Sequence, residues 1–303
     1  QRMILSKHNI KNCVVLFGII ALINISCKKD GNPNNLPGVN PGDYDGKIDG
    51  YTSSDEIFPQ NLIANWTFDD TRNELKSGTA PTTSVNNTFI AGGVRGKALS
   101  LTSGYLYYAT QFQKFKTDAL KSWSMSLWVQ ILNNQNTVNK RTMVFQMARS
   151  GVFNGNINFI LNTRDFPSTN TTKFRINPTF ATVNSITGGG MQDNLNNVLD
   201  NTDLTQWVHI VLTYDITTGV FNNWMNAVKV GNFPNRGTTN IYKSWEPSEV
   251  FIGANYNAAG INPVGADATF APMTGSIDEI RVYDRVLPDA HIKALNNLGK
   301  AGK

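Results

Sequence analysis

The sequence contains almost no cysteine: Cys13 and Cys27 are the two in a chain of 303 residues. Both lie near the N-terminus, so residues 28–303 have neither a disulfide framework nor a cysteine nucleophile. Histidine is nearly as scarce, with His8, His209 and His291, and no Gly-x-Ser-x-Gly nucleophile motif occurs. Few groups remain for nucleophilic or acid–base catalysis, and we expect a protein that is not an enzyme.

Charged residues make up only 16% of the chain, with a formal net charge of +5. Arg2, Lys7 and Lys11 lie in a predicted leader, and without them 24 of the 27 basic residues remain against 22 acidic ones. No basic stripe is left that could follow a phosphate backbone, so nucleic acid is not an expected partner. Asn, Thr, Ser and Gly are abundant instead, which is typical of an extracytoplasmic β protein with polar loops.

One long apolar run is present, at residues 13–23, and it follows the basic residues Lys7 and Lys11. This run is too short for a stable membrane span, and the pattern is typical of a signal peptide over residues 1–26. The run ends at Ile25-Ser-Cys27, which resembles a bacterial lipobox, although Asn24 replaces the usual apolar residue. We expect Cys27 to carry the lipid anchor; the alternative is a plain secretory leader with a chance cysteine.

The residues after Cys27 indicate an address and a tether. Lys28-Lys-Asp30 resembles the short charged signal that directs lipoproteins of Bacteroidetes-type bacteria to the outer face of the outer membrane. Residues 27–60 are rich in Gly, Asn, Pro and Asp, with too few apolar residues to offset their ordering entropy. We therefore predict a lipid-anchored flexible tether over 27–60 and an outer-membrane location facing the cell exterior.

Residues 61–303 read as one domain of short strands separated by turn residues. The predicted strands lie at 62–68, 98–101, 105–108, 123–130, 142–147, 157–161, 173–176, 207–214, 221–230, 250–253 and 275–284. So many short strands with one helix predict an all-β fold, an antiparallel two-sheet jelly-roll sandwich with a short C-terminal helix.

The end of the chain carries the clearest local signals. Ile280 and Val282 alternate with polar or aromatic residues over 279–283, the period expected of a half-buried strand. Pro288 then opens a short amphipathic helix, and Gly299 is expected to close it.

Five stretches in this order resemble the laminin-G-like, concanavalin-A-like sandwich family. They are residues 66–69, 93–99, 124–128, 207–211 and 275–287. Two departures matter. The family usually has Asn-Gly in a tight hairpin where this chain has Asn226-Ala227, and Ala resists the positive φ of such a turn, so we expect a longer or different hairpin. The Glu-x-Asp-x-x-Glu run of laminarinase-type relatives is absent, and Asp278 and Glu279 are expected on opposite faces of their strand.

The resemblance implies a structural Ca²⁺ ion. Similar proteins bind Ca²⁺ where the first and last strands lie side by side, which here implicates Asp69 and Asp278 with a main-chain carbonyl near Gly93. The alternative is that both carboxylates accept main-chain hydrogen bonds at turns. The resemblance also assigns His209 a structural role within its strand.

Loop residues suited to a sugar are also present. Trp245 lies in a polar segment, and Tyr256, Asn162, Arg164 and Asp165 lie in loops or at strand ends that could face the same concavity. The alternative is that Trp245 packs against its own loop.

Fold resemblance and address together predict a surface lipoprotein that binds a polysaccharide or oligosaccharide. Its expected partner is an outer-membrane importer of the SusC/SusD type. An adhesion module or a structural subunit of a surface complex is the alternative, and a glycoside hydrolase is disfavoured.

Overall fold

The computed structural model describes residues 46–109, 112–116, 120–131, 141–162, 166–167, 169–182, 197–199, 203–233, 241–243, 249–266 and 268–303. They belong to one compact unit, Gly46–Lys303. The predicted leader and its lipid-anchor residue Cys27 lie outside the described residues. Within the described part, no helix is long and apolar enough to cross a membrane.

Strands dominate this unit, which confirms the predicted all-β class. They are β1 (Leu62–Trp66), β2 (Thr83–Ala91), β3 (Lys97–Tyr108), β4 (Trp123–Ile131), β5 (Arg141–Arg149), β6 (Val152–Asn162), β7 (Phe174–Ile176), β8 (Thr179–Phe180), β9 (Asn197–Leu199), β10 (Val208–Asp215), β11 (Val220–Met225), β12 (Val228–Phe233), β13 (Glu249–Ile252), β14 (Phe270–Ala271) and β15 (Met273–Tyr283). The helical elements are η2 (Ser54–Glu56), η3 (Gln113–Phe115), α2 (Tyr256–Ala259) and α3 (Asp289–Lys300).

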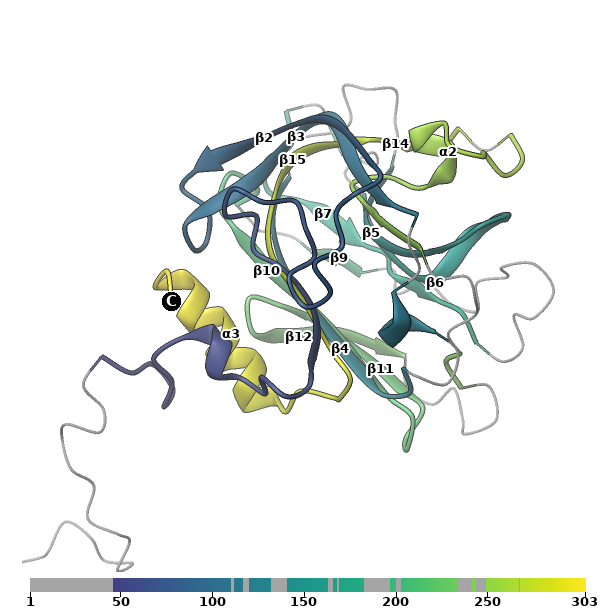
Figure 1. Ribbon diagram of the computed structural model, residues 1–303. Coiled ribbons are helices and arrows are strands. Elements are labelled where there is room, and N and C mark those ends of the chain that lie inside the picture. The colour runs from purple at the N-terminus through teal and green to yellow at the C-terminus, as the bar shows by residue number, and fades with distance from the viewer. Residues whose placement is uncertain are drawn as a thin grey trace, which may run out of the picture. The chain divides into compact units, whose positions relative to one another are not determined.

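The strands form one sheet that curls into two layers (Figure 1). Its order is β12-β11-β10-β4-β15-β3-β13-β5-β6-β7-β9, and the described pairs are antiparallel except β14 with β5. Strand β3 belongs to both layers, because residues 99–104 pair with β15 and residues 106–108 pair with β13. The predicted antiparallel jelly-roll sandwich is confirmed.

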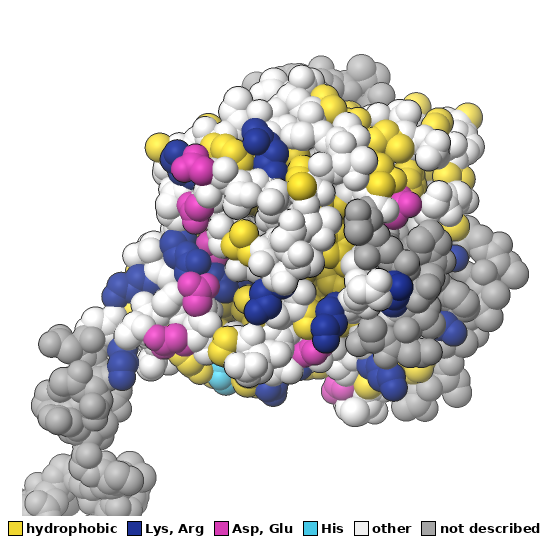
Figure 2. Space-filling model, viewed as in Figure 1, with side chains coloured by type: hydrophobic (Ala, Val, Ile, Leu, Met, Phe, Trp, Pro, Cys, Tyr) yellow, Lys and Arg dark blue, Asp and Glu magenta, His cyan; other side chains and the backbone are white. Residues whose placement is uncertain are grey.

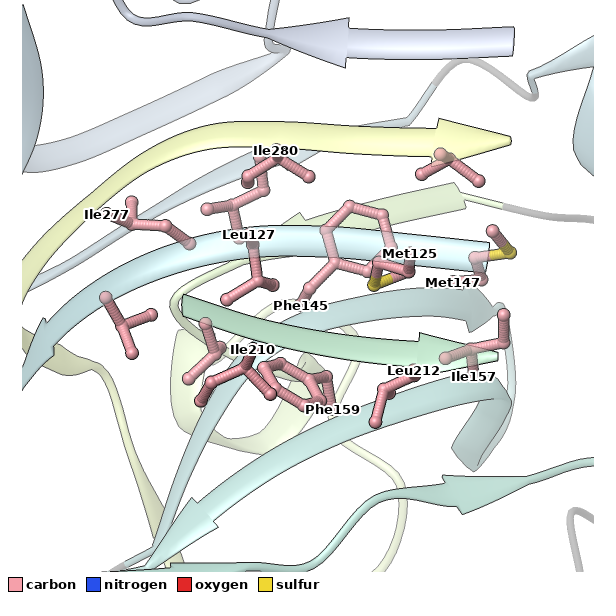
Figure 3. Packing of buried hydrophobic residues seen from close by; sticks show 14 of the residues in the cluster. Met125, Leu127, Phe145, Met147, Ile157, Phe159, Ile210, Leu212, Ile277 and Ile280 are labelled. Atoms are coloured by element: carbon pink, nitrogen blue, oxygen red, sulfur yellow. The ribbon is translucent and has the colours of Figure 1, made fainter. Parts of the chain in front are cut away.

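The main core lies between the two layers (Figure 3). Side chains from β4, β10 and β15 face side chains from β5 and β6, and each is at most 1% exposed: Met125, Leu127, Ile210, Leu212, Ile277, Ile280, Phe145, Met147, Ile157 and Phe159. Alternate positions along each strand supply most of them, as the period of two predicts.

Strand β15 is buried on both faces, so the predicted half-buried strand is wrong in one respect. Ile280 and Val282 lie in the main core, as expected, but Arg281 is 2% exposed and Tyr283 is fully buried. Helix α3 covers this outer face, where Tyr283 packs in a second apolar cluster with Leu295. The outer face of β15, which carries Arg281 and Tyr283, is therefore a second packing surface and does not face solvent.

The segment 46–60 is folded, although the sequence predicts a tether as far as residue 60. Ile57 is 1% exposed and packs in the same cluster as Leu295 of α3. The compact unit therefore begins at Gly46 rather than at residue 61.

The hairpin between β11 and β12 corrects another expectation. It is a tight two-residue turn in which Asn226 has φ 47° and Ala227 has φ 67°. Asn226 holds it in place: its N–H donates to the His209 carbonyl at 2.8 Å, and its side-chain oxygen accepts the His209 N–H at 3.0 Å. These bonds hold Ala227 in the left-handed region that an alanine disfavours.

Ala227→Gly should therefore stabilise the protein, because glycine adopts this φ without steric cost. We expect the free energy of unfolding to rise by about 1 kcal/mol in urea denaturation. Ala254→Gly, at a fully buried alanine, should instead lower it. A neutral or destabilising Ala227→Gly would contradict a strained turn.

Candidate functional site

The carboxylates of Asp69 and Asp278 both accept hydrogen bonds from the same turn, residues 93–97. Asp278 is fully buried on β15, and its Oδ2 accepts the N–H groups of Val94 at 2.7 Å and Arg95 at 3.3 Å. Asp69 follows β1, and its Oδ1 accepts the Lys97 N–H at 2.8 Å. The two carboxylates thus hold the turn from two strands that are paired with each other.

Gly93 allows the turn to approach the buried carboxylate. A Cβ on Gly93 would lie 2.5 Å from the Lys97 carbonyl oxygen and 2.8 Å from Asp278 Oδ2. The Gly93 N–H donates to the Gly96 carbonyl at 3.2 Å. The three residues predicted from the resemblance are therefore brought together.

The Asp278 carboxylate is in an environment that disfavours its negative charge. Burial, and then the adjacent Glu279 carboxylate, raise the pKa of Asp278 to about 8 against the lowering effect of its main-chain N–H donors. Both carboxylates accept main-chain N–H groups in this structure, which is the alternative to a metal site. Carboxylate oxygens are also the hard donors that Ca²⁺ prefers, and a cation would relieve the charge on Asp278. The residues fit Ca²⁺ in this respect, although the described part holds no group of three or more His, Cys, Asp and Glu residues that could bind a metal alone.

A bulge in β15 places Asp278 and Glu279 on the same side, contrary to the expectation of opposite faces. Ile277 and Ile280 both lie in the core, and the pairing with β4 shifts register between Asp278 and Arg281. Glu279 has φ 48°, a rare backbone conformation for this residue type, and both carboxylates point away from the core.

Glu279 belongs to a charge network with Arg281, Arg95 and Asp55. Arg281 Nη2 lies 2.5 Å from Glu279 Oε2 and 2.8 Å from Asp55 Oδ1. Arg95 bridges the same two acids, with Nη1 2.8 Å from Asp55 and Nε 3.2 Å from Glu279. Burial opposes the Arg281 charge, but Glu279, Tyr283 and Asp55 together outweigh this effect and raise the pKa of Arg281. The cavity beside the network measures about 10 Å³, which leaves no room for a sugar ring.

His209 packs within the same covered face. It is 1% exposed, its Nε2 lies 2.8 Å from Ser126 Oγ, and its ring stacks on Trp128 with centroids 4.6 Å apart. Burial, and then the positive charges of Lys300 and Arg281, lower the pKa of His209 to about 3. The imidazole is therefore neutral in the folded protein at ordinary pH.

This pKa predicts that His209 makes the fold sensitive to acid. Because the unfolded state binds a proton near pH 6.5 and folded His209 does not, His209 should contribute a loss of stability below pH 6.5 of about 1.4 kcal/mol per pH unit. Asp278, whose pKa is raised, contributes in the opposite sense over the same range. His209→Gln should remove the His209 contribution from the slope in urea denaturation between pH 7 and 5.5, whereas His291→Gln, at a partly exposed histidine, should change the slope less. Parallel slopes for the wild type and His209→Gln would rule out the effect.

The predicted sugar-binding residues are only partly described. Trp245, Arg164 and Asp165 lie outside the described residues. Asn162 ends β6 and is 3% exposed. Tyr256 was expected in a ligand-facing wall, but it is 1% exposed and offers no open ring face.

Tyr256 is held in a small core of its own. Its hydroxyl donates to Glu249, which also accepts the Tyr107 hydroxyl at 2.7 Å. The Tyr256 ring meets Phe251 edge to face at 4.9 Å between centroids. We assign Tyr256 to packing, because both its ring and its hydroxyl are engaged.

A groove that the sequence did not predict lies beside β1 and η3, and we call it the β1 groove. Its volume is about 490 Å³, within the range typical of small-ligand sites. It is lined by Pro59, Gln60, Leu62, Ile63, Glu74, Lys76, Ser77, Thr79, Phe112, Gln113, Lys114, Phe115 and Asp284. Figure 2 shows hydrophobic side chains in a hollow of this face, with Lys and Arg side chains near it.

Comparison with known families and structures places this fold. Residues 102–293, more than half of the chain, match the family described as the concanavalin A-like lectin/glucanases superfamily. No curated protein matches the sequence significantly.

Three solved structures illustrate the fold similarity. Domain 4 of AbnA, an extracellular arabinanase from Geobacillus stearothermophilus solved with arabinotriose, is 17% identical, covers 78% of this chain and 98% of its own, and has a TM-score of 0.48. The binding domain of Paraclostridial Mosquitocidal Protein 1 is 13% identical with a TM-score of 0.53 (78% and 52% covered). The botulinum neurotoxin serotype D ligand binding domain, solved with N-acetylneuraminic acid, is 9% identical with a TM-score of 0.50 (81% and 52%). This chain spans about half of the latter two.

Proposed function

Because the chain belongs to the concanavalin A-like lectin/glucanases superfamily, we propose that it is a non-catalytic domain that binds glycan. The observation that carries this proposal is the β1 groove, which combines apolar surface with amide, hydroxyl and charged groups at a size suited to a short saccharide. The neurotoxin domain of similar fold, solved with N-acetylneuraminic acid, is in keeping with it. The adjacent acids Asp278 and Glu279 are not presented to a saccharide ligand, because Asp278 is fully buried against the 93–97 turn and Glu279 is paired with Arg281 and Arg95.

The proposed setting is the outer membrane, facing the cell exterior. Lipidation of Cys27 would hold the domain at the surface, and the chain between Cys27 and Gly46 would act as a tether. Beside a SusC/SusD-type importer, such a domain would raise the local concentration of polymer through avidity.

Affinity gel electrophoresis of the full chain against a panel of neutral and acidic polysaccharides tests the binding function. If a detergent is needed to keep the full chain with its apolar run 13–23 in solution, it should lack a sugar headgroup, because such a headgroup could compete with the polysaccharide for the site. Retardation by at least one polymer is the expected result. If no polymer retards the chain, the glycan proposal fails and the adhesion or complex-subunit alternative takes its place.

We also propose a structural Ca²⁺ ion at the 93–97 turn, held by Asp69, Asp278 and main-chain carbonyls. Ca²⁺ at about 100 times its Kd should stabilise the fold by about 2.7 kcal/mol, and EDTA should remove this gain in thermal denaturation. Asp278→Asn should abolish the response, while Asp203→Asn, at an exposed aspartate elsewhere, should keep it. A wild-type melting temperature that is indifferent to Ca²⁺ and EDTA would refute the site.

A further inference from the structure

The β1 groove has an apolar side with accessible surface. Pro59 is exposed and Ile63 is half-buried, and both line the groove above the buried side chains of Leu62, Phe112 and Phe115. Such a surface suits the C–H face of a sugar ring, whose burial is favourable in proportion to the area covered.

The rim of the groove offers neutral hydrogen-bonding groups. Gln60 and Gln113 are exposed amides; Ser77 is exposed and Thr79 is half-buried, and their hydroxyl oxygens lie 2.7 Å apart. Amide and hydroxyl groups both donate and accept hydrogen bonds, which suits the hydroxyl groups of a saccharide.

Two lysines give the groove its free charge. Lys76 and Lys114 both line it, and both are exposed. Within the described chain, neither ammonium group forms a hydrogen bond or an ion pair, whereas Lys97 is paired with Asp70 at 2.6 Å. The two ammonium groups therefore remain available to an anionic ligand.

The carboxylates of the groove are already engaged. Glu74 is fully buried: its Oε1 accepts the main-chain N–H of Asn65 at 2.7 Å and of Lys76 at 2.8 Å, and its Oε2 accepts both the N–H and the hydroxyl of Ser77 at 2.6 Å. Asp284 is exposed, and its Oδ1 accepts the Asn61 side-chain amide at 2.7 Å. Glu74 therefore shapes the loop, and among the described residues neither Glu74 nor Asp284 forms an ion pair with Lys76 or Lys114.

We propose that the β1 groove binds an anionic saccharide, with its acidic group between Lys76 and Lys114 and its C–H face against Pro59 and Ile63. The inference rests on the proposed glycan-binding function and names the ligand class. A sugar carboxylate and a sugar sulfate share this chemistry, since lysine binds either as a point charge.

Equilibrium binding of the full chain to matched polymers tests the inference. The acidic probes are polygalacturonate, hyaluronan and dextran sulfate; the neutral probes are methyl-esterified polygalacturonate, carboxyl-reduced hyaluronan and dextran. The groove variant is Lys76→Gln with Lys114→Gln. The control is Lys229→Gln with Lys293→Gln, which removes equal charge at exposed lysines that do not line the groove.

We expect binding to at least one acidic polymer, loss of binding to its neutral counterpart, and affinity about tenfold weaker in the groove variant. The control variant should bind as the wild type does, and all variants should keep the wild-type melting temperature. Preference for polygalacturonate or hyaluronan would identify a carboxylate ligand, and preference for dextran sulfate a sulfate ligand.

Three outcomes would overturn the inference. Binding to neutral polymers that the groove variant leaves unchanged would keep the glycan function and remove this site. An equal loss of affinity in the groove and control variants would mean that the polymer responds to the total charge of the protein and not to this groove. Failure to bind any polymer, neutral or acidic, would remove the proposed function together with its ligand class.

Discussion

Arg281→Met should lower the free energy of unfolding by about 3–5 kcal/mol. Arg281 is 2% exposed and lies 2.5 Å from Glu279, which is itself 4% exposed. Without the guanidinium group, the Glu279 carboxylate would stay buried with its main countercharge gone, and the protein would have to protonate it or admit water. Urea denaturation at pH 7 measures the loss.

Two controls separate this effect from the loss of packing. Arg281→Met combined with Glu279→Met removes both charges and should regain much of the stability, because apolar replacements of a buried pair are often well tolerated. Lys97→Met breaks a pair whose side chains are 46% and 68% exposed, and should cost less than about 1 kcal/mol. If Arg281→Met costs no more than Lys97→Met, the network is not a determinant of stability.

The same charge network explains why the prediction of a flexible tether for residues 46–60, the segment before β1, was wrong. Its Gly, Asn and Asp content predicts a flexible tether, and local composition gives no reason to expect otherwise. The partners of Asp55 are Arg95 and Arg281, which are 40 and 226 residues away along the chain. Only the assembled sheet brings those cations together, so no local pattern could reveal the contact.

Strands and core were predictable for the opposite reason. The alternation of apolar side chains in β4 and β15 is local, and the side chains that face the main core follow from strand geometry except at the bulge. The other face of both strands is buried too. The bulge at Glu279 was not predictable, since positive φ at glutamate has no propensity signal and depends on contacts made by both flanking strands. An alanine in the hairpin turn is a similar case, in which the Asn226 contacts override the preference of Ala227.

The candidate sites divide in the same way. Asp69 and Asp278 could be predicted to lie close together near Gly93, because the resemblance supplied the pairing of the first and last strands. The β1 groove draws its lining from several separate stretches that share no motif, so it became visible only with the fold. Tyrosine is a residue type common in binding sites, but the Tyr256 hydroxyl already donates a hydrogen bond to Glu249.

Gly299→Ala should destabilise the protein by about 2–3 kcal/mol, although the same change in an ordinary helix stabilises by about 0.5–1 kcal/mol. Gly299 was expected to end the last helix, but α3 continues to Lys300, and Gly299 is where the helix meets Trp128. A Cβ there would lie 2.3 Å from Trp128 Cζ2 and 2.7 Å from Cε2. Thermal and urea denaturation measure the change.

Whether Gly299→Ala lowers or raises the stability shows how tightly α3 packs on the sheet. Trp128 cannot swing aside freely, because its ring stacks on buried His209, so the helix itself would have to move. Trp128→Phe shortens the ring system and should restore part of the stability of Gly299→Ala, while Lys293→Ala, on the exposed side of α3, should be nearly neutral. A stabilising Gly299→Ala would mean that helix propensity prevails and that α3 can shift on the sheet, which would also loosen the cover over Arg281 and Glu279.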